Sequence, residues 1–343
     1  MMQLRRYRSW LAAPVLIAFA VPADDLGFHP KSDHEIKKDL KIDLELKTEK
    51  IEISVNGEST PPDEMGFDED PTKVALRVTA TDKYVQAKDG RPTDLLRTFD
   101  SLRLSYETGD KKEDAPKFDA LEGKTVRFKW NADTEAYEKS LKDGKGEDAL
   151  LEPLSEDMDV RLLLPPKKVS EGDSWDVPGQ KLMPLFLPGG LPGPLGTSDD
   201  KEELQTVLEE LRSAFSKLQD DLKIQCKYRG SKEDGGAKVA EIEFRFSTTG
   251  KADISHLIET LISMEEDGIH PDAEANADVE LSGDGVLLWD LSDGRVHALT
   301  MDTEAGIDLD VKTRFAIEGE DIAMNAKIRL STKTGTKLET SKP

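Results

Sequence analysis

Apolar and polar side chains alternate with a two-residue period over much of the chain, and this pattern constrains the fold more than any other feature. Over residues 40–46 leucine or isoleucine fills every second position, and the pattern repeats over 51–55 before the turn-forming pair Asn56-Gly57. Alternation of this kind predicts strands with one packed face and one face in water. It returns after residue 222, with glycine-containing hairpin turns expected at 234–236 and 292–294. We therefore expect a β-rich α+β protein with one or two curved antiparallel sheets, similar to a half-barrel.

The first 23 residues have the pattern of an export signal. Three arginines, at positions 5, 6 and 8, precede an apolar stretch, and small residues suit cleavage after Ala20 or Ala23. The stretch is shorter than the ~20 apolar residues that a bilayer-spanning helix needs. We expect a mature chain that is periplasmic or extracellular and is not an integral membrane protein.

The chain is strongly acidic. Its formal charge is −23 at pH 7, and removal of the three arginines, with no acids among residues 1–23, would change it to −26. A field of this sign repels phosphate backbones, so we expect no nucleic-acid partner. Cys226 is the only cysteine, which excludes an intramolecular disulfide, and its alternation with Ile224 and Tyr228 predicts a buried, inert thiol.

Changes in the pattern divide the chain into five parts. Residues 1–23 form the signal, residues 24–37 are polar and expected to be disordered, and residues 38–180 form an N-terminal β-rich half. Residues 181–198 combine proline and glycine with leucine and phenylalanine, which predicts an extended apolar crossover. Residues 199–343 are expected to form a helix followed by a C-terminal antiparallel meander.

Two helices are predicted within this last part. Over 199–223, acidic residues fill the first turn and apolar residues, among them Leu208, Leu211 and Phe215, recur every three or four positions. This stripe predicts a long amphipathic helix packed on the concave face of a sheet. A second, shorter helix is predicted over 253–266 from the same spacing.

Two short motifs raise the question of catalysis. Gly172-Asp173-Ser174 and the sequence DGIHP at 267–271 resemble motifs of the Gly-Asp-Ser esterase and lipase family. The resemblance implies Ser174 as the nucleophile, His270 as its base and Asp267 as the residue that orients the imidazole. An esterase is therefore one alternative for this chain.

The first of these segments also fits a turn. Pro165 and Pro166 stand where that family has a strand before its serine, and residues 175–269 contain no asparagine to stabilise an oxyanion. A tight turn at Gly172 would instead present Trp175 to the core as a strand begins. This interpretation leaves the protein without catalytic residues.

Other polar groups give weaker signals. A zinc site built from His29, His34 and nearby acids is one metal alternative, and the acidic clusters at 68–71 and 265–267 suggest at most weak surface calcium. Our leading prediction includes neither a metal nor a cofactor. Arg91 and Arg97 could bind an anion, or they could lock a hairpin by pairing with carboxylates, for which Asp100 is the nearest candidate. The second use is the commoner one.

Three stretches carry a broader resemblance: GKTVRFKWN at 123–131, LLLPPKKVSEGDSW at 162–175 and GDGVLLWDLSDGRV at 283–296. Together they resemble a group of exported bacterial proteins of unknown function with curved antiparallel sheets. The general shape is similar to the periplasmic half-barrels of the lipoprotein-carrier type. This resemblance implies a fold and no catalytic residues.

The function that these observations favour is that of a non-enzymatic envelope protein. It would bind an apolar or amphipathic ligand, such as a lipid-like small molecule, between sheet and helix, with Leu185, Phe186, Leu208, Leu211 and Phe215 as candidate contacts. The alternative is a structural or protein-interaction scaffold whose core is filled and whose partner is another envelope protein.

Overall fold

The computed structural model describes residues 24–62, 70–109, 111–115, 118–142, 144, 148–192, 222–265, 271–317 and 320–342. The strands are β1 (His34–Val55), β2 (Glu58–Thr60), β3 (Thr72–Lys88), β4 (Arg91–Thr108), β5 (Lys111–Asp114), β6 (Thr125–Asn131), β7 (Ala136–Leu141), β8 (Ser174–Pro178), β9 (Lys223–Asp234), β10 (Ala237–Asp253), β11 (Asp272–Asp290), β12 (Arg295–Ile317) and β13 (Glu320–Ser341). The helices are α1 (Asp148–Leu151), α2 (Leu182–Phe186) and α4 (Ser255–Glu265), with short 3-10 turns η2 (Phe118–Leu121), η3 (Arg161–Leu163) and η4 (Gly179–Lys181).

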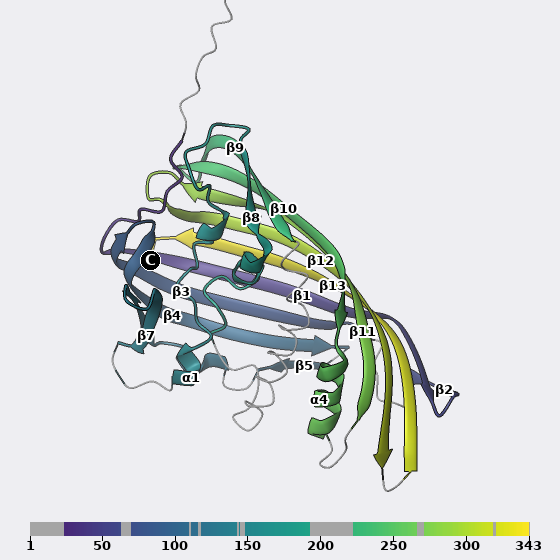
Figure 1. The fold of residues 1–343 in the computed structure, drawn as a ribbon. Helices are drawn as coiled ribbons and strands as arrows, with labels where there is room; N and C mark the ends of the chain where they lie inside the picture. The colour runs from purple at the N-terminus through teal and green to yellow at the C-terminus, as the bar shows by residue number, and fades with distance from the viewer. Residues whose placement is uncertain are drawn as a thin grey trace, which may run out of the picture.

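All of these strands belong to one open antiparallel sheet (Figure 1). The order is β7-β6-β4-β3-β1-β13-β12-β11-β10-β9-β8, with β2 paired to β1 and β5 to β4. The first and last strands lie side by side in its middle, in register from Lys37 opposite Ser341 to Val55 opposite Met324. The two parts of the chain that the sequence separates at 181–198 therefore share a single sheet.

The predicted hairpin turns are confirmed. Asn56 and Gly57 have φ values of 53° and 88°, and Gly235 and Gly236 have 55° and 82°. Two successive residues with positive φ form the turn whose twist matches that of the flanking strands. Gly294, with φ 57°, has a further reason to be glycine, because a Cβ there would lie 2.7 Å from the backbone nitrogen of His29.

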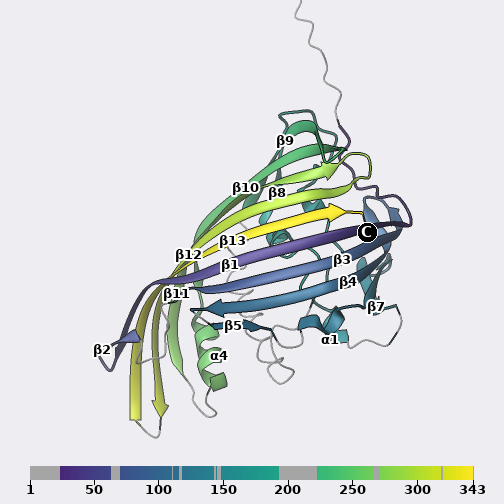
Figure 2. The same ribbon diagram turned by 180° about the vertical axis from the view of Figure 1, so that it is seen from behind.

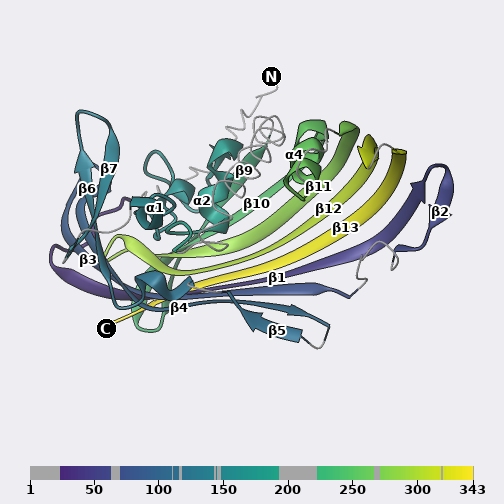
Figure 3. The same cartoon turned by 90° about the horizontal axis from the view of Figure 1, so that it is seen from below.

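The sheet is curved, and the described helices lie on its concave side (Figure 3). Seen from behind, the long strands lie in front of these helices (Figure 2). Alternation assigns every second side chain to the concave face. A bulge in β1 between Thr48 and Lys50 shifts this alternation by one, so that Ile42 before the bulge and Ile53 after it point to the same face.

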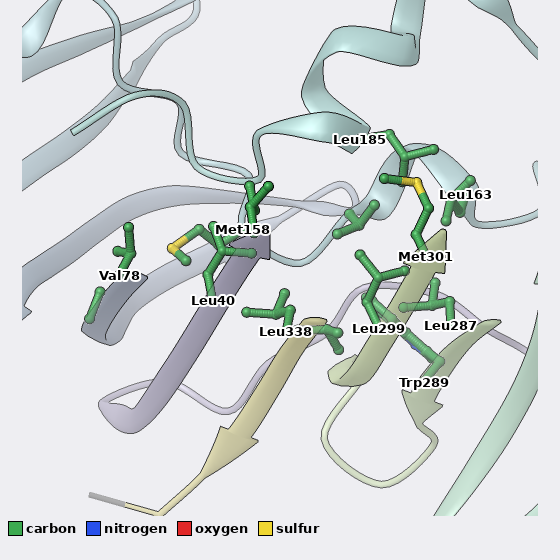
Figure 4. Close-up of a cluster of buried hydrophobic side chains, with 14 of the residues drawn as sticks. Leu40, Val78, Met158, Leu163, Leu185, Leu287, Trp289, Leu299, Met301 and Leu338 are labelled. Atoms are coloured by element: carbon green, nitrogen blue, oxygen red, sulfur yellow. The ribbon is translucent and has the colours of Figure 1, made fainter. Parts of the chain in front are cut away.

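The larger of two apolar clusters lies at the end of the concave face where β1 begins and β13 ends. There Met158, from the segment before η3, and Leu185, from α2, pack over the sheet side chains Leu40, Leu299, Met301 and Leu338 (Figure 4). Strand β11 carries glycine at two positions under this cluster, and a Cβ on Gly283 or Gly285 would lie 2.5 Å from the ring of Phe246 or Phe244. These glycines let the two phenyl rings lie across the strand.

The N-terminal segment corrects one expectation. Residues 24–37 were expected to be disordered because they are polar, but Leu26 and Phe28 are buried and β1 already begins at His34. The backbone of Asp24 pairs with Val169, and the amide of His29 donates to the carbonyl of Gly294 at 3.1 Å. Two apolar side chains are enough to anchor this segment, because each enters the main core.

Of the predicted helices, the shorter one is confirmed as α4. The long amphipathic helix predicted over 199–223 lies almost wholly outside the described residues; of its span only Leu222 and Lys223 are described, and Lys223 begins β9. The longest helix in the described part of the chain is α4, with 11 residues. None of the described helices is long and apolar enough to cross a membrane.

Candidate functional site

Charged side chains enter the core at the end of the concave face where β1 begins. Lys38, Asp82 and Arg97 occupy positions of β1, β3 and β4 that alternation directs inward, where an apolar residue is the usual choice. Tyr84 lies two residues beyond Asp82 on β3, and Asp159 approaches from the segment before η3. All five side chains are buried. We call this group the ionic clasp.

The members of the clasp satisfy one another. Arg97 donates from Nε and Nη2 to the two carboxylate oxygens of Asp82, at 2.6 and 2.9 Å. Lys38 Nζ lies 2.9 Å from Asp82 Oδ2 and 3.0 Å from Asp159 Oδ1, and it donates to Tyr84 Oη at 2.8 Å. Tyr84 in turn donates to Asp159 Oδ2 at 2.5 Å. Two cations and two carboxylates thus balance without a ligand.

The electrostatic effects follow from this arrangement. Burial alone would raise the pKa of Asp82, but the Arg97 guanidinium and the Lys38 ammonium outweigh burial and hold that pKa below its usual value. Burial, with the carboxylates of Asp159 and Asp82 beside it, raises the pKa of Tyr84 well above its usual value. The Asp82 carboxylate is therefore charged at neutral pH, and the Tyr84 phenol keeps its proton.

The clasp ties the segment that covers the sheet to the sheet itself. Arg97 Nη1 donates to the carbonyl of Ser155 at 2.8 Å, and Nη2 donates to that of Glu156 at 2.9 Å. Val160, next to Asp159, has φ 54°, a conformation that β-branched residues rarely adopt. A strained residue persists only where its surroundings fix it. We interpret the clasp as a structural device, because its charges are paired and closed off from solvent.

This arrangement corrects the interpretation of Arg91, Arg97 and Asp100. Arg97 pairs with Asp82 and not with Asp100, which instead accepts a hydrogen bond from Thr81 at 2.7 Å. Arg91 lies over the ring of Trp130, 4.3 Å from its centroid. The two arginines therefore point to different partners and do not form an anion site.

The candidate catalytic residues are only partly described. Ser174 is the exposed first residue of β8, after a turn in which Gly172 has φ 93°. Trp175 donates from its indole nitrogen to the carbonyl of Leu163 at 3.1 Å, as expected for a turn that presents this ring to the core. Asp267 and His270 lie outside the described residues. The esterase alternative accordingly stays a prediction.

The candidate ligand contacts divide in the same way. Leu185 is fully buried in the main cluster, over Met301 (Figure 4), and Phe186 packs edge-on against Phe246 at 6.0 Å between ring centroids. These two residues of α2 fill the core. Leu208, Leu211 and Phe215 lie outside the described residues.

The other end of the concave face has a different lining, which we call the distal floor. It consists of inward positions on four neighbouring strands, and it contains no charged side chain. Its members are Ile51, Ile53 and Val55 of β1, Met324, Ala326 and Ile328 of β13, Ile307, Leu309 and Val311 of β12, and Ala275, Ala277 and Val279 of β11.

The described residues cover the distal floor only in part. Leu257 of α4 and Ile254, the residue just before this helix, pack on this cluster, and α4 makes its contacts with β11. On β12, Leu309 is only partly buried, as is its cross-strand neighbour Ile328 on β13. On α4 itself, Leu261 is 40% exposed. Sequence alternation predicted the floor, but it could not show that its side chains remain half exposed.

The convex face carries a hollow of about 580 Å³. Its floor is made by the small outward residues Ala75, Ser105 and Gly335, because longer side chains occupy the rows on either side. Those long side chains pair with one another across strands, as in Lys73–Glu107 and Lys333–Glu304, each at 3.5 Å. Since opposite charges alternate along its walls, the hollow favours no particular ligand.

A metal site is not evident in the described part of the chain, where no three histidine, cysteine or acidic side chains gather closely enough to hold an ion. His34 instead lies 4.0 Å from Asp293, which Lys31 also contacts. Cys226 is buried beside Ile224 and Tyr228, as alternation predicted, and burial raises its pKa to about 12.

Comparison with models of protein families gives no match, and no curated protein matches. Among solved structures, the chain is similar to OmpT, an outer membrane protein of Vibrio cholerae, at 11% identity over 91% of this chain and 99% of that one, with a TM-score of 0.14. It is similar to OccK11 of Pseudomonas aeruginosa at 7% identity over 93% and 100%, with a TM-score of 0.14. Scores this low carry no argument about fold or function. The resemblance to exported half-barrel proteins has no support from these comparisons.

Proposed function

We propose that this protein is an exported, non-enzymatic carrier that binds an amphipathic ligand on the distal floor. The observation that supports the proposal is that the apolar lining of the concave face continues beyond the covered core, while its outer side chains remain only partly buried. Each square ångström of apolar surface left in water costs roughly 25 cal/mol, so a concave apolar surface favours an apolar occupant.

The charge distribution agrees with a ligand on this face. Outward side chains of the same strands form cross-strand ion pairs, such as Arg329 with Asp308 at 2.7 Å and Lys312 with Glu274 at 3.6 Å. Inward side chains of the distal floor are all uncharged. Water solvates the charged outer face well. A ligand therefore lowers the free energy more by covering the apolar concave face than by covering the outer face.

The long helix predicted over 199–223 belongs to this proposal. Its apolar stripe, which includes Leu208, Leu211 and Phe215, would face the concave side and form a second wall for the ligand. The half-barrel resemblance, which is also part of the proposal, pairs a curved sheet with a helix in the same way. Hydrogen exchange over 199–223, with and without ligand, measures whether this segment is helical.

Native mass spectrometry of the protein purified from its own envelope tests the function. We expect one lipid-like adduct per chain, a mature N-terminus after Ala20 or Ala23, and loss of the adduct in Leu309→Asp. The matched control is Asp310→Asn, the outward neighbour of Leu309 on β12, which should keep the adduct. An adduct-free spectrum from folded wild-type protein, or equal adducts in both variants, would contradict the proposal and favour a scaffold with a filled core.

A further inference from the structure

Three threonines lie between the covered core and the distal floor on the concave face. Thr48 of β1 and Thr332 and Thr334 of β13 occupy inward positions there, in the same alternation as the apolar residues on either side of them. All three side chains are partly exposed. We call this group the threonine band.

The hydroxyls of the threonine band are free to bind a ligand. No hydrogen bond joins any of these hydroxyls to another residue that the structure describes. Thr332 and Thr334 lie about 7 Å apart on one face of β13, and Thr48 lies opposite Leu330, the next inward residue towards the distal floor. Each hydroxyl can both donate and accept a hydrogen bond, so the band suits a head group that does the same.

The threonine band leads directly into the partly exposed side of the distal floor. Leu330 lies opposite Ile307 on β12, and both side chains are partly exposed. From Thr332 the apolar surface runs about 20 Å along β13 to Ala326, which is buried again. Two opposed acyl chains span the ~30 Å hydrocarbon core of a bilayer, so one chain covers about 15 Å. The surface beyond the band therefore has room for one acyl chain laid along the strand.

The lining of this region carries no charge. The inward side chains are all uncharged over residues 44–55 of β1, 303–313 of β12 and 324–334 of β13. An ionic head group held against this lining would lose water without gaining a counter-ion. A head group with several hydroxyls would instead exchange hydrogen bonds with the threonines. The chemistry of the lining therefore favours a neutral, polar head group.

We infer that the ligand is a single-chain amphiphile with a neutral, polyhydroxylated head group, such as a sugar. Its head lies on the threonine band, and its chain lies over Leu330, Ile307 and Ile328 towards Ala326. This inference rests on the proposed function and specifies the chemical class of the ligand and its orientation at the same site.

Dodecyl maltoside and dodecanoate carry alkyl chains of the same length and serve as probes. Titration calorimetry, below the critical micelle concentrations, measures their affinities for the delipidated full chain. We expect wild-type protein to bind dodecyl maltoside about tenfold more tightly than dodecanoate. The double variant Thr332→Val with Thr334→Val should weaken dodecyl maltoside binding about tenfold and leave dodecanoate binding unchanged, because only the sugar uses both hydroxyls. Thr332→Ser with Thr334→Ser keeps both hydroxyls and should bind dodecyl maltoside as wild-type protein does.

The matched control is Thr300→Val, which removes an exposed hydroxyl from the outward face of β12 and should leave both affinities unchanged. Equal dodecyl maltoside affinities for wild type and the double valine variant, with both proteins folded by circular dichroism, would overturn the head-group assignment. Loss of that binding in Leu309→Asp would show in the same experiment that the carrier function stands. Equal affinities of wild-type protein for the two probes would also overturn the assignment. Failure of wild-type protein to bind either probe would overturn both the assignment and the carrier function.

Discussion

The two ends of the concave face share strand β1 but differ in the chemistry of their inward side chains. At the end where β1 begins, Lys38, Asp82 and Arg97 point inward, and a covering segment supplies Asp159 to complete their pairing. At the distal floor the inward residues are apolar and the cover is partial. A buried charge tolerates no gap, since an unpaired ion in the interior costs several kcal/mol, whereas an apolar surface loses only in proportion to the area exposed. The clasp therefore has to be fully covered by protein, whereas the distal floor can remain partly exposed.

Removal of one clasp member should give the largest effect of any single substitution considered. Arg97→Met leaves the Asp82 carboxylate without its bidentate partner and frees the covering segment from the sheet, so we expect a loss of about 3–5 kcal/mol in the free energy of unfolding. Urea denaturation followed by circular dichroism measures the loss. Arg329→Met, which breaks the exposed pair with Asp308, is the control and should leave the midpoint unchanged. Equal urea midpoints for Arg97→Met and Arg329→Met would show that the charges of the clasp are not buried and paired as described.

Cavity-forming substitutions compare the two ends directly. Leu299 and Leu309 lie ten residues apart on the same face of β12, the first fully buried and the second partly buried. We expect Leu299→Ala to lower the free energy of unfolding by about 2–5 kcal/mol, and Leu309→Ala to lower it by about 1 kcal/mol in delipidated protein. If Leu309→Ala costs as much as Leu299→Ala, the distal floor is packed like the core and has no room for a ligand.

Acid should weaken the clasp through Asp82. Because its pKa is lower in the folded protein than in the unfolded chain, the contribution of Asp82 to stability is complete above the unfolded value of about 4 and is lost as the pH falls below it. The free energy of unfolding should therefore fall less steeply below pH 4 in Asp82→Asn than in wild-type protein. Parallel pH profiles for the two proteins would contradict the charged state that we assign to this carboxylate.

Thiol labelling compares the exposure of single residues at the two ends, and it has the smallest expected effect on the protein. Cys226 is buried, and burial raises its pKa to about 12, so a thiol reagent at pH 8 should not modify it until the protein unfolds in urea. In a Cys226→Ala background, a thiol introduced by Ile328→Cys on the distal floor should react in the folded state, and bound ligand should slow the reaction. Rapid labelling of Cys226 in the folded protein, or no labelling of the cysteine at position 328, would contradict the proposed difference in exposure between the covered core and the distal floor.

Much of this architecture follows from the sequence, because alternation is a local property. Long strands such as β1, β3 and β10, the Asn56-Gly57 turn and α4 were predicted from neighbouring residues, whereas the short strands β2, β5 and β7 were not. The pairing of β1 with β13 was not, since it joins the two ends of the chain and no local pattern encodes it. Folding of residues 24–33 onto the core was also missed, because only Leu26 and Phe28 mark it.

The clasp left a signal in the sequence that periodicity alone could have detected. Lys38 lies between Ile36 and Leu40, and Arg97 lies between Leu95 and Phe99, so each cation occupies an apolar phase of its strand. A charge in that phase indicates a buried partner. Which partner it meets depends on strand register, and for this reason the sequence suggested Asp100, which is near in sequence, as a candidate partner and did not suggest Asp82.

The central position of the pair β1–β13 determines when this sheet can be completed. Strand β1 is among the first parts of the chain to be synthesised, whereas β13 is the last strand, and the register between them runs for most of the length of both. Contacts between residues so far apart form slowly, because most of the chain must be ordered before they can form. If the chain is exported N-terminus first, it therefore crosses the membrane before its middle strands can meet, and the full sheet assembles only after the C-terminus has arrived.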